Sequence, residues 1–278
     1  EDDSLFVQYE GKDLENLGLI KMDFLGLTTL SVLRIAQKLV AQRFGVTVAL
    51  EEIPLDDKET LALFARGETV GLFQFESPAM RRFLRQLQVN RFEDLVAMNA
   101  LYRPGPMDSI PTFIARKTGK EPISYIVPEA KAVLEETYGV TVYQEQVMML
   151  SRMLAGFTPG QSDKLRKVMA KKQSDDLPEQ EKLFKEGCSK HNFPKEKADE
   201  VWQEWTNFAK YAFNKSHSVC YAYVAFQTGF FKAHYPSELM AANLEVYHGD
   251  PSQLRVLMAE CKRMGIRVLQ PDVNESEE

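Results

Sequence analysis

The 278-residue sequence contains only three cysteines, four histidines and two tryptophans, and it has no long hydrophobic run. The cysteines, Cys188, Cys220 and Cys261, are odd in number and far apart, which matches neither a disulfide framework nor a Cys-x-x-Cys metal site. No apolar run approaches the roughly 20 residues that a membrane-spanning helix needs. The acidic start lacks the basic flank and apolar core of a signal peptide. We therefore expect a globular, cytoplasmic chain without a membrane partner.

Positive charge is also scarce. The 34 lysines and arginines are outnumbered by 40 aspartates and glutamates, which gives a net charge of −6. A protein that coats nucleic acid with its whole surface is normally basic, so any contact with a polyanion must come from local basic clusters. With 44% hydrophobic residues, the chain can bury the core of one large domain or two moderate ones.

The hydrophobic periodicity predicts a mainly helical fold. Apolar residues recur at helical spacing in residues 28–43. Ser77-Pro78 and Thr158-Pro159 each combine a capping residue with a proline at the first helical position. Most of the chain after residue 27 follows such signals, and we expect a multi-helix domain.

A few short extended segments are expected beside the helices. In residues 19–25 polar and apolar side chains alternate, which is the period of a strand. Residues 1–27 are therefore interpreted as strands, and the segments 70–76, 140–143 and 266–269 as short extended pieces.

A polar cluster stands directly ahead of an aromatic run late in the chain. Its members are Asn214, Lys215, Ser216, His217 and Ser218. Apolar residues follow from Val219 to Phe230 in steps of four and three, which places them on one face of a helix that a serine of the cluster can cap. The unpaired N–H groups at the helix start would then meet a lysine, a histidine and hydroxyls, which together can hold a phosphate. The alternative is an ordinary cap with a solvated lysine and a structural histidine.

A second basic cluster lies on the helix predicted for residues 159–172. Its cations have only Asp163 to offset them before the acidic run that follows. Like charges at spacings of three and four repel one another by a few tenths of a kcal/mol per pair, which suggests an external anion. The alternative is a solvated basic face. The cations are Lys164, Arg166, Lys167, Lys171 and Lys172.

Five motifs along the chain resemble segments of one known family. They are residues 21–27 (Lys-Met-Asp-Phe-Leu-Gly-Leu), 102–106 (Tyr-Arg-Pro-Gly-Pro), 143–148 (Tyr-Gln-Glu-Gln-Val-Met), 165–172 (Leu-Arg-Lys-Val-Met-Ala-Lys-Lys) and 213–218 (Phe-Asn-Lys-Ser-His-Ser). Together they resemble the fingers domain of the bacterial replicative DNA polymerases of family C, the DNA polymerase III alpha subunits. That family often has a second arginine and a glycine where this chain has Lys167 and Ala170. Lysine keeps the charge but lacks the bidentate fork of arginine.

The resemblance implies a division of the chain and an enzyme. Residues 1–27 would be the last strands of the palm, and residues 28–278 a helical, nucleotide-binding fingers domain. The parent would be a DNA-directed DNA polymerase, and this chain an excised piece that is inactive alone. Asp23 would hold Mg²⁺ together with two carboxylates that have no counterpart here, because two-metal phosphoryl transfer needs several converging carboxylates.

The resemblance also implies ligands and partners. They are the triphosphate of the incoming dNTP, the template–primer DNA, the palm and thumb of the alpha subunit and, through it, the replicase holoenzyme with its sliding clamp. The dNTP-binding residues would be Arg103, Arg166, Lys167, Lys171, Lys172, Asn214, Lys215, Ser216, His217, Ser218 and Tyr221.

A function of a different class stays open, namely a stand-alone helical protein that binds a nucleotide or another anion without chemistry. Primer extension that appears only when the upstream segment is added would distinguish the two. A hydrolase built on the four histidines is disfavoured, because they stand at no recognised ligand spacing.

Overall fold

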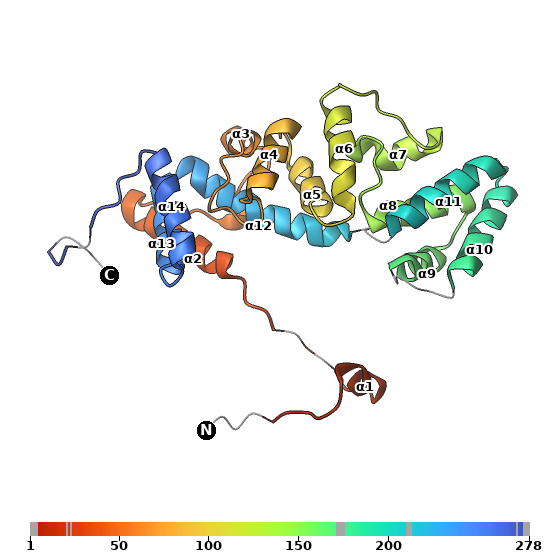
Figure 1. The fold of residues 1–278 in the computed structure, drawn as a ribbon, viewed down its shortest axis with the longest axis horizontal. Helices are drawn as coiled ribbons and strands as arrows, with labels where there is room; N and C mark the ends of the chain where they lie inside the picture. The colour runs from red at the N-terminus through yellow and green to blue at the C-terminus, as the bar shows by residue number, and fades with distance from the viewer. Residues whose placement is uncertain are drawn as a thin grey trace.

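The computed structural model describes residues 5–20, 22, 24–170, 176–209, 213–270 and 272–274. Within these ranges the chain forms fourteen α-helices, so the predicted mainly helical fold is confirmed (Figure 1). No helix of the described part is long and apolar enough to cross a bilayer.

The helices follow one another with connections that range from the single residue Tyr235 to the longer segments 45–57 and 118–130. The first seven are α1 (Gly11–Asn16), α2 (Thr28–Phe44), α3 (Lys58–Ala65), α4 (Pro78–Leu87), α5 (Phe92–Leu101), α6 (Ile110–Lys117) and α7 (Lys131–Leu134). The others are α8 (Gln144–Ala155), α9 (Pro159–Ala170), α10 (Leu177–Lys190), α11 (Lys195–Ala209), α12 (Lys215–His234), α13 (Pro236–Val246) and α14 (Pro251–Arg263). Short 3₁₀ turns are η1 (Leu50–Glu52), η2 (Pro106–Ser109), η3 (Pro128–Ala130) and η4 (Glu135–Thr137).

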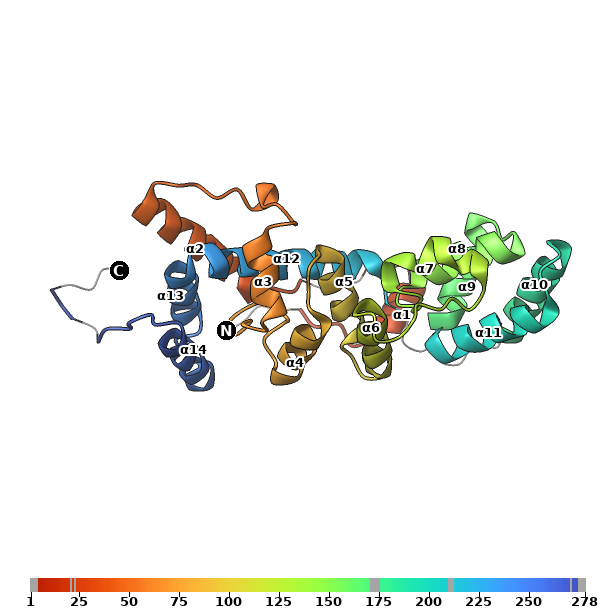
Figure 2. The ribbon, with the colours of Figure 1, turned by 90° about the horizontal axis from the view of Figure 1, so that it is seen from above.

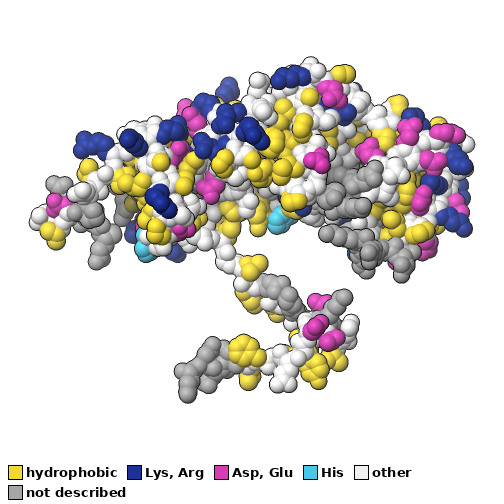
Figure 3. Space-filling view, viewed as in Figure 1, with side chains coloured by type: hydrophobic (Ala, Val, Ile, Leu, Met, Phe, Trp, Pro, Cys, Tyr) yellow, Lys and Arg dark blue, Asp and Glu magenta, His cyan; other side chains and the backbone are white. Residues whose placement is uncertain are grey.

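The strands expected in residues 1–27 and in the short segments are not found among the described residues. The only β-type pairing among the described residues is an isolated parallel bridge between Tyr143 and Phe213. The N-terminal segment contains helix α1 instead, and its apolar side chains face solvent, as Phe24 does with 89% exposure (Figure 3). Alternation alone does not make a strand, because the hydrogen-bond ladder needs a partner strand, and the described part supplies none.

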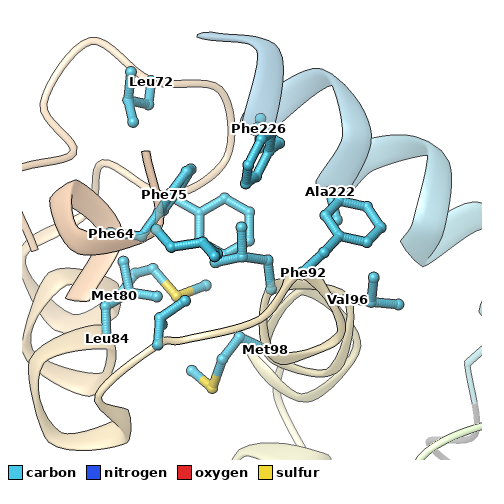
Figure 4. Packing of buried hydrophobic residues seen from close by; sticks show 14 of the residues in the cluster. Phe64, Leu72, Phe75, Met80, Leu84, Phe92, Val96, Met98, Ala222 and Phe226 are labelled. Atoms are coloured by element: carbon cyan, nitrogen blue, oxygen red, sulfur yellow. The ribbon is translucent and has the colours of Figure 1, made fainter. Parts of the chain in front are cut away.

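The larger hydrophobic core surrounds α12, which packs against α3, α5 and α13 (Figures 1 and 4). Phe226 of α12 lies at the centre of this core. Its ring stacks at 6.4 Å on Phe64 and meets the edge of Phe92 at 5.9 Å. Gly229 lets α3 approach α12, since a Cβ there would lie 2.6 Å from the Phe64 ring. Burying each such aromatic side chain is worth about 1.5–3 kcal/mol.

A second core is enclosed by α7 to α11. Phe184 of α10 packs against Trp202 and Trp205 of α11 with ring centroids 5.7 and 4.8 Å apart. The two tryptophans are only 4% and 1% exposed. Both tryptophans therefore belong to this core and do not form a surface that could stack on bases.

The two cores meet where α8 and α12 begin. The backbone N–H of Gln144 donates to the carbonyl of Phe213 at 2.9 Å, next to the Tyr143–Phe213 bridge. In both ribbon views the helices form an elongated row, with α10 and α11 at one end, α13 and α14 at the other and α12 running between (Figures 1 and 2). The start of α12 thus lies at the junction between the cores.

Two helix starts follow their capping signals in the sequence, and the start of α12 does not. Ser77 caps α4 by accepting from the N–H of Met80 at 3.2 Å. Thr158 and Gln161 form the reciprocal pair of a capping box, each accepting from the other's backbone N–H, at 3.3 and 2.8 Å. For α12 a serine cap was predicted, but Asn214 is the residue that caps the helix.

Candidate functional site

The backbone N–H groups at the start of α12 are largely bound within the protein. The Asn214 side chain accepts from the N–H of His217 at 2.9 Å, and the Asn214 carbonyl accepts from the N–H of Ser218 at 3.2 Å. The N–H of Lys215 donates to both carboxylate oxygens of Glu145, at 3.0 and 3.1 Å. The helix start therefore offers an anion fewer free donors than the sequence predicted, and the side chains must supply most of the attraction.

The Lys215 ammonium lies at the surface between an aromatic ring and a carboxylate. Its Nζ donates to Glu136 at 2.6 Å and lies 5.4 Å from the centre of the Tyr143 ring. The side chains of Lys215 and Glu136 are 36% and 34% exposed. A ligand in solution can therefore reach this cation.

A continuous ladder of rings and one guanidinium runs along the first turns of α12. The Arg103 guanidinium lies 3.8 Å from the centre of the Phe213 ring, which meets the edge of His217 at 5.2 Å. His217 stacks on Tyr221 at 4.2 Å, and Tyr221 contacts Phe73 at 5.1 Å. The ladder joins three sequence-predicted residues, which are Arg103, His217 and Tyr221.

Arg103 is held in place by its surroundings. Its Nε donates to the carbonyl of Ala100 at 3.1 Å while the guanidinium covers Phe213. Burial lowers the pKa of Arg103, but a guanidinium keeps its charge at any physiological pH. The loop that follows, residues 104–106, is stiffened by two prolines, and the arginine ahead of it covers the Phe213 ring.

The second basic cluster reaches the same junction through α8. An Nη of Arg166 lies 3.5 Å from the side-chain oxygen of Gln144, the residue whose N–H is bonded to Phe213. Arg166 also donates to Asp163 at 2.8 Å, and Lys167 contacts the other Asp163 oxygen at 2.7 Å. Hydrogen bonds from Lys167 and Arg166 lower the pKa of Asp163. Asp163 therefore pairs with two cations of the basic cluster at once.

Other predicted residues take less central positions. Ser216 is exposed, whereas Ser218 is fully buried, with an Oγ that has no hydrogen-bond partner. The Ser218 hydroxyl therefore faces the core and not the surface that carries Lys215. Asp23, Lys171 and Lys172 lie outside the described residues.

The predicted site residues did not include six contributors to the junction, which are Phe73, Glu136, Tyr143, Gln144, Glu145 and Phe213. Phe213 stands directly before the cap of α12, and that position was the one available signal. Phe73 also lines a cavity of about 620 Å³ that opens between the start of α2, residues 71–77 and helices α13 and α14.

Within the described residues, no three His, Cys, Asp or Glu side chains are placed to hold a metal ion together. The Mg²⁺ that the family resemblance implies therefore finds no ligand set among these residues. Asp23, the one ligand that the sequence suggested, is not among them.

The fold and the junction define a helical domain that presents cations from three separate segments beside a ladder of aromatic rings. Comparison with known proteins gives the family. The family described as the bacterial DNA polymerase III alpha subunit finger domain matches residues 29–192, more than half of the chain. The chain belongs to this family.

The similarity to individual relatives extends over almost the whole chain. It is 46% identical to the DNA polymerase III subunit alpha of Aquifex aeolicus over 272 residues, which are 97% of this chain and 23% of that protein. The subunits of Thermus aquaticus and Bacillus subtilis are 43% and 42% identical, again over 97% of this chain, and it covers 22% and 24% of them. The chain thus spans about a quarter of the length of these relatives.

Proposed function

We propose that this chain is the fingers portion of a replicative DNA-directed DNA polymerase and that the junction at the start of α12 binds the triphosphate of the incoming dNTP. The proposal is supported by membership of the finger domain family and by relatives that carry the name of the polymerase subunit. Residues 1–27 would belong to the palm and residues 28–278 to the fingers, and the parent would act in the cytoplasm.

One observation carries the proposed site. Arg103, Arg166 and Lys215 come from three distant segments, and all three contact residues 143, 144 or 213, which are bonded to one another at the junction of the cores. Lys215 and Arg166 are paired with Glu136 and Asp163, and a polyphosphate that reaches both cations would add charge-assisted hydrogen bonds from two segments. Arginine and lysine at such a point are suited to phosphate oxygens.

The chain's own residues would bind and orient the nucleotide. Lys215 and the two arginines would neutralise phosphate charge, while His217 and Tyr221 would present flat rings to the sugar or base. Positioning and charge neutralisation are the main contributions that a protein makes to phosphoryl transfer. Mg²⁺, held by the parent with carboxylates of the palm, would supply the Lewis acid. The template–primer, the rest of the alpha subunit and the sliding clamp would be partners of the parent.

A titration with dATP and Mg²⁺ tests the site. We expect Lys215→Ala and Arg166→Ala each to weaken binding about tenfold, since a charge-assisted hydrogen bond is worth about 1.5–3 kcal/mol. Lys182→Ala is the matched control. It removes the same charge, and Lys182 pairs with Glu186 on the exposed surface of α10. Equal affinities for all four chains would refute the shared site.

Activity needs a second experiment. Joined to the upstream palm segment, the chain should extend a primer, and Lys215→Ala should slow this extension. If the joined protein binds dATP but never extends a primer, the stand-alone binding function is the correct one.

A further inference from the structure

The backbone N–H and the ammonium of Lys215 each already donate to a carboxylate of the protein. The backbone N–H donates to Glu145, and Nζ donates to Glu136 at 2.6 Å. The ammonium has three N–H donors, so Glu136 does not saturate it, but it does neutralise its charge. A phosphate at this point would therefore compete with a carboxylate of the protein for the charge of Lys215.

The two carboxylates are not equivalent. Glu145 lies in the first turn of α8, where an acidic side chain stabilises the helix, and it ties that turn to the start of α12. Glu136 lies on η4, and within the described part of the chain its carboxylate accepts a hydrogen bond from Lys215 alone. Glu145 is thus part of the architecture, whereas the Glu136 carboxylate can leave Lys215 by rotating into solvent.

The backbone that carries Glu136 is fixed independently of its side chain. An Nη of Arg91 donates to the Glu136 carbonyl at 2.7 Å, and the Arg91 guanidinium covers the Tyr138 ring at 5.0 Å. Arg91 is in turn paired with the fully buried Asp94 at 3.3 Å. The carboxylate is therefore held near Lys215 by a turn that does not depend on the salt bridge.

We propose that Glu136 is the built-in counter-ion of Lys215 and that it sets the affinity of the site by competing with the ligand's phosphate. The inference rests on the proposed function, since it needs a phosphate at Lys215. In the free protein Glu136 keeps the ammonium paired and oriented over Tyr143. An incoming phosphate competes with the carboxylate for the three N–H donors of Nζ, and Glu136 stays close enough to repel it.

This competition shapes which anions the site accepts. An anion with one or two charges that reaches only Lys215 exchanges one ion pair for another and gains little. A triphosphate reaches Lys215 and also the arginines at the same junction, so the additional contacts offset the exchange. Glu136 thereby lowers the affinity of the site for small anions such as inorganic phosphate. The Lys215–Glu136 pair thus determines the specificity of the site for a triphosphate over smaller anions.

Replacing Glu136 by glutamine tests the inference, because glutamine keeps the shape and removes the charge. The probe is inorganic tripolyphosphate, titrated calorimetrically at low ionic strength into the wild-type chain and its variants. We expect Glu136→Gln to tighten binding about three- to tenfold, as expected for an exposed ion pair worth up to about 1 kcal/mol plus the relieved repulsion. Glu135→Gln is the control: it lies on the same turn, is exposed and removes the same charge. It should change the affinity less than twofold.

The remaining variants separate this inference from the proposed site. In the Lys215→Ala background the gain from Glu136→Gln should fall to the level of the Glu135→Gln control. If Lys215→Ala weakens binding while Glu136→Gln leaves it unchanged or weakens it, the site stands and the counter-ion role is refuted. If Lys215→Ala has no effect, or if no chain binds tripolyphosphate, the proposed site fails and the inference with it. Equal gains from Glu135→Gln and Glu136→Gln would indicate net charge alone and would also refute the role.

Discussion

Helix α12 carries a lysine–glutamate pair near each end, and the two pairs have nearly the same length. Lys215 lies 2.6 Å from Glu136, and Lys232 lies 2.7 Å from Glu260. Their burial differs completely: the first pair is 36% and 34% exposed, the second 0% and 4%. Distance therefore does not tell a replaceable pair from a structural one, whereas burial does, because an unpaired charge is costly only where water cannot reach it.

The buried pair also fastens a loop to the core. The Lys232 ammonium donates to the carbonyl of Val70 at 2.6 Å, close to the segment that carries Phe73. Glu260 accepts two further hydrogen bonds from Arg263, both at 2.8 Å. This end of α12 thus positions the last ring of the ladder, while the other end presents Lys215 to a ligand.

The largest expected effect is that of Lys232→Ala. The variant leaves Glu260 buried with only Arg263 and leaves the Val70 carbonyl without its donor. We expect a loss of about 3 kcal/mol in the free energy of unfolding, measured by urea denaturation. Lys232→Met combined with Glu260→Gln removes both charges and should lose less than the single variant. A loss below about 1 kcal/mol for Lys232→Ala would contradict the comparison.

The second largest effect is expected from acid, which should weaken the buried Lys232–Glu260 pair. Although burial by itself raises the pKa of the Glu260 carboxyl, hydrogen bonds from Arg263 and Lys232 lower it from the ordinary 4.5 to about 2. The folded pKa lies below the unfolded one, so the stabilisation is complete above about pH 4.5 and is lost as the pH falls towards about 2.

Unfolding measurements between about pH 5 and pH 3 check this dependence. The wild-type chain should lose stability more steeply than Glu260→Gln, with an extra slope of up to about 1.4 kcal/mol per pH unit for one proton. Parallel curves for the two chains would show that Glu260 has no such shift.

The features that sequence predicted well are local. The helix expected in residues 28–43, the Ser77 cap and the capping box at Thr158 depend on residues within one or two turns of each other, and all three are confirmed. The strands expected in residues 1–27 depend on a partner that the sequence does not specify, and helix α1 occupies part of that segment. Periodicity thus predicts an element only where the element is stable without a distant partner.

The candidate site shows the same limit. The motif at residues 213–218 marked the start of α12 and its lysine, but Glu136 and Glu145 come from 79 and 70 residues away. No pattern in the sequence connects them to Lys215. The sequence could therefore mark the candidate cations, but not the carboxylates that pair with Lys215.

A smaller effect is expected at the exposed end of α12 from Asn214→Ala. The Asn214 side chain accepts from the His217 N–H, and losing such a cap typically costs about 1 kcal/mol of unfolding free energy. Asn214→Asp keeps an acceptor and should retain most of the stability in the same urea experiment. If the two variants were equally destabilised, the amide would have a role other than capping.

The smallest expected effect on stability is that of Lys215→Ala, even though its ion pair is the shorter of the two. In the variant, water replaces the ammonium beside the Glu136 carboxylate, and exposed pairs contribute about 0.2–1 kcal/mol. Urea unfolding should therefore show a loss below about 1 kcal/mol, which added salt reduces further because it screens the pair. A loss as large as that of Lys232→Ala would place Glu136 and Lys215 in the architecture of the junction. Glu136 would then not be free to leave when a phosphate arrives, and the counter-ion role proposed for it could not hold.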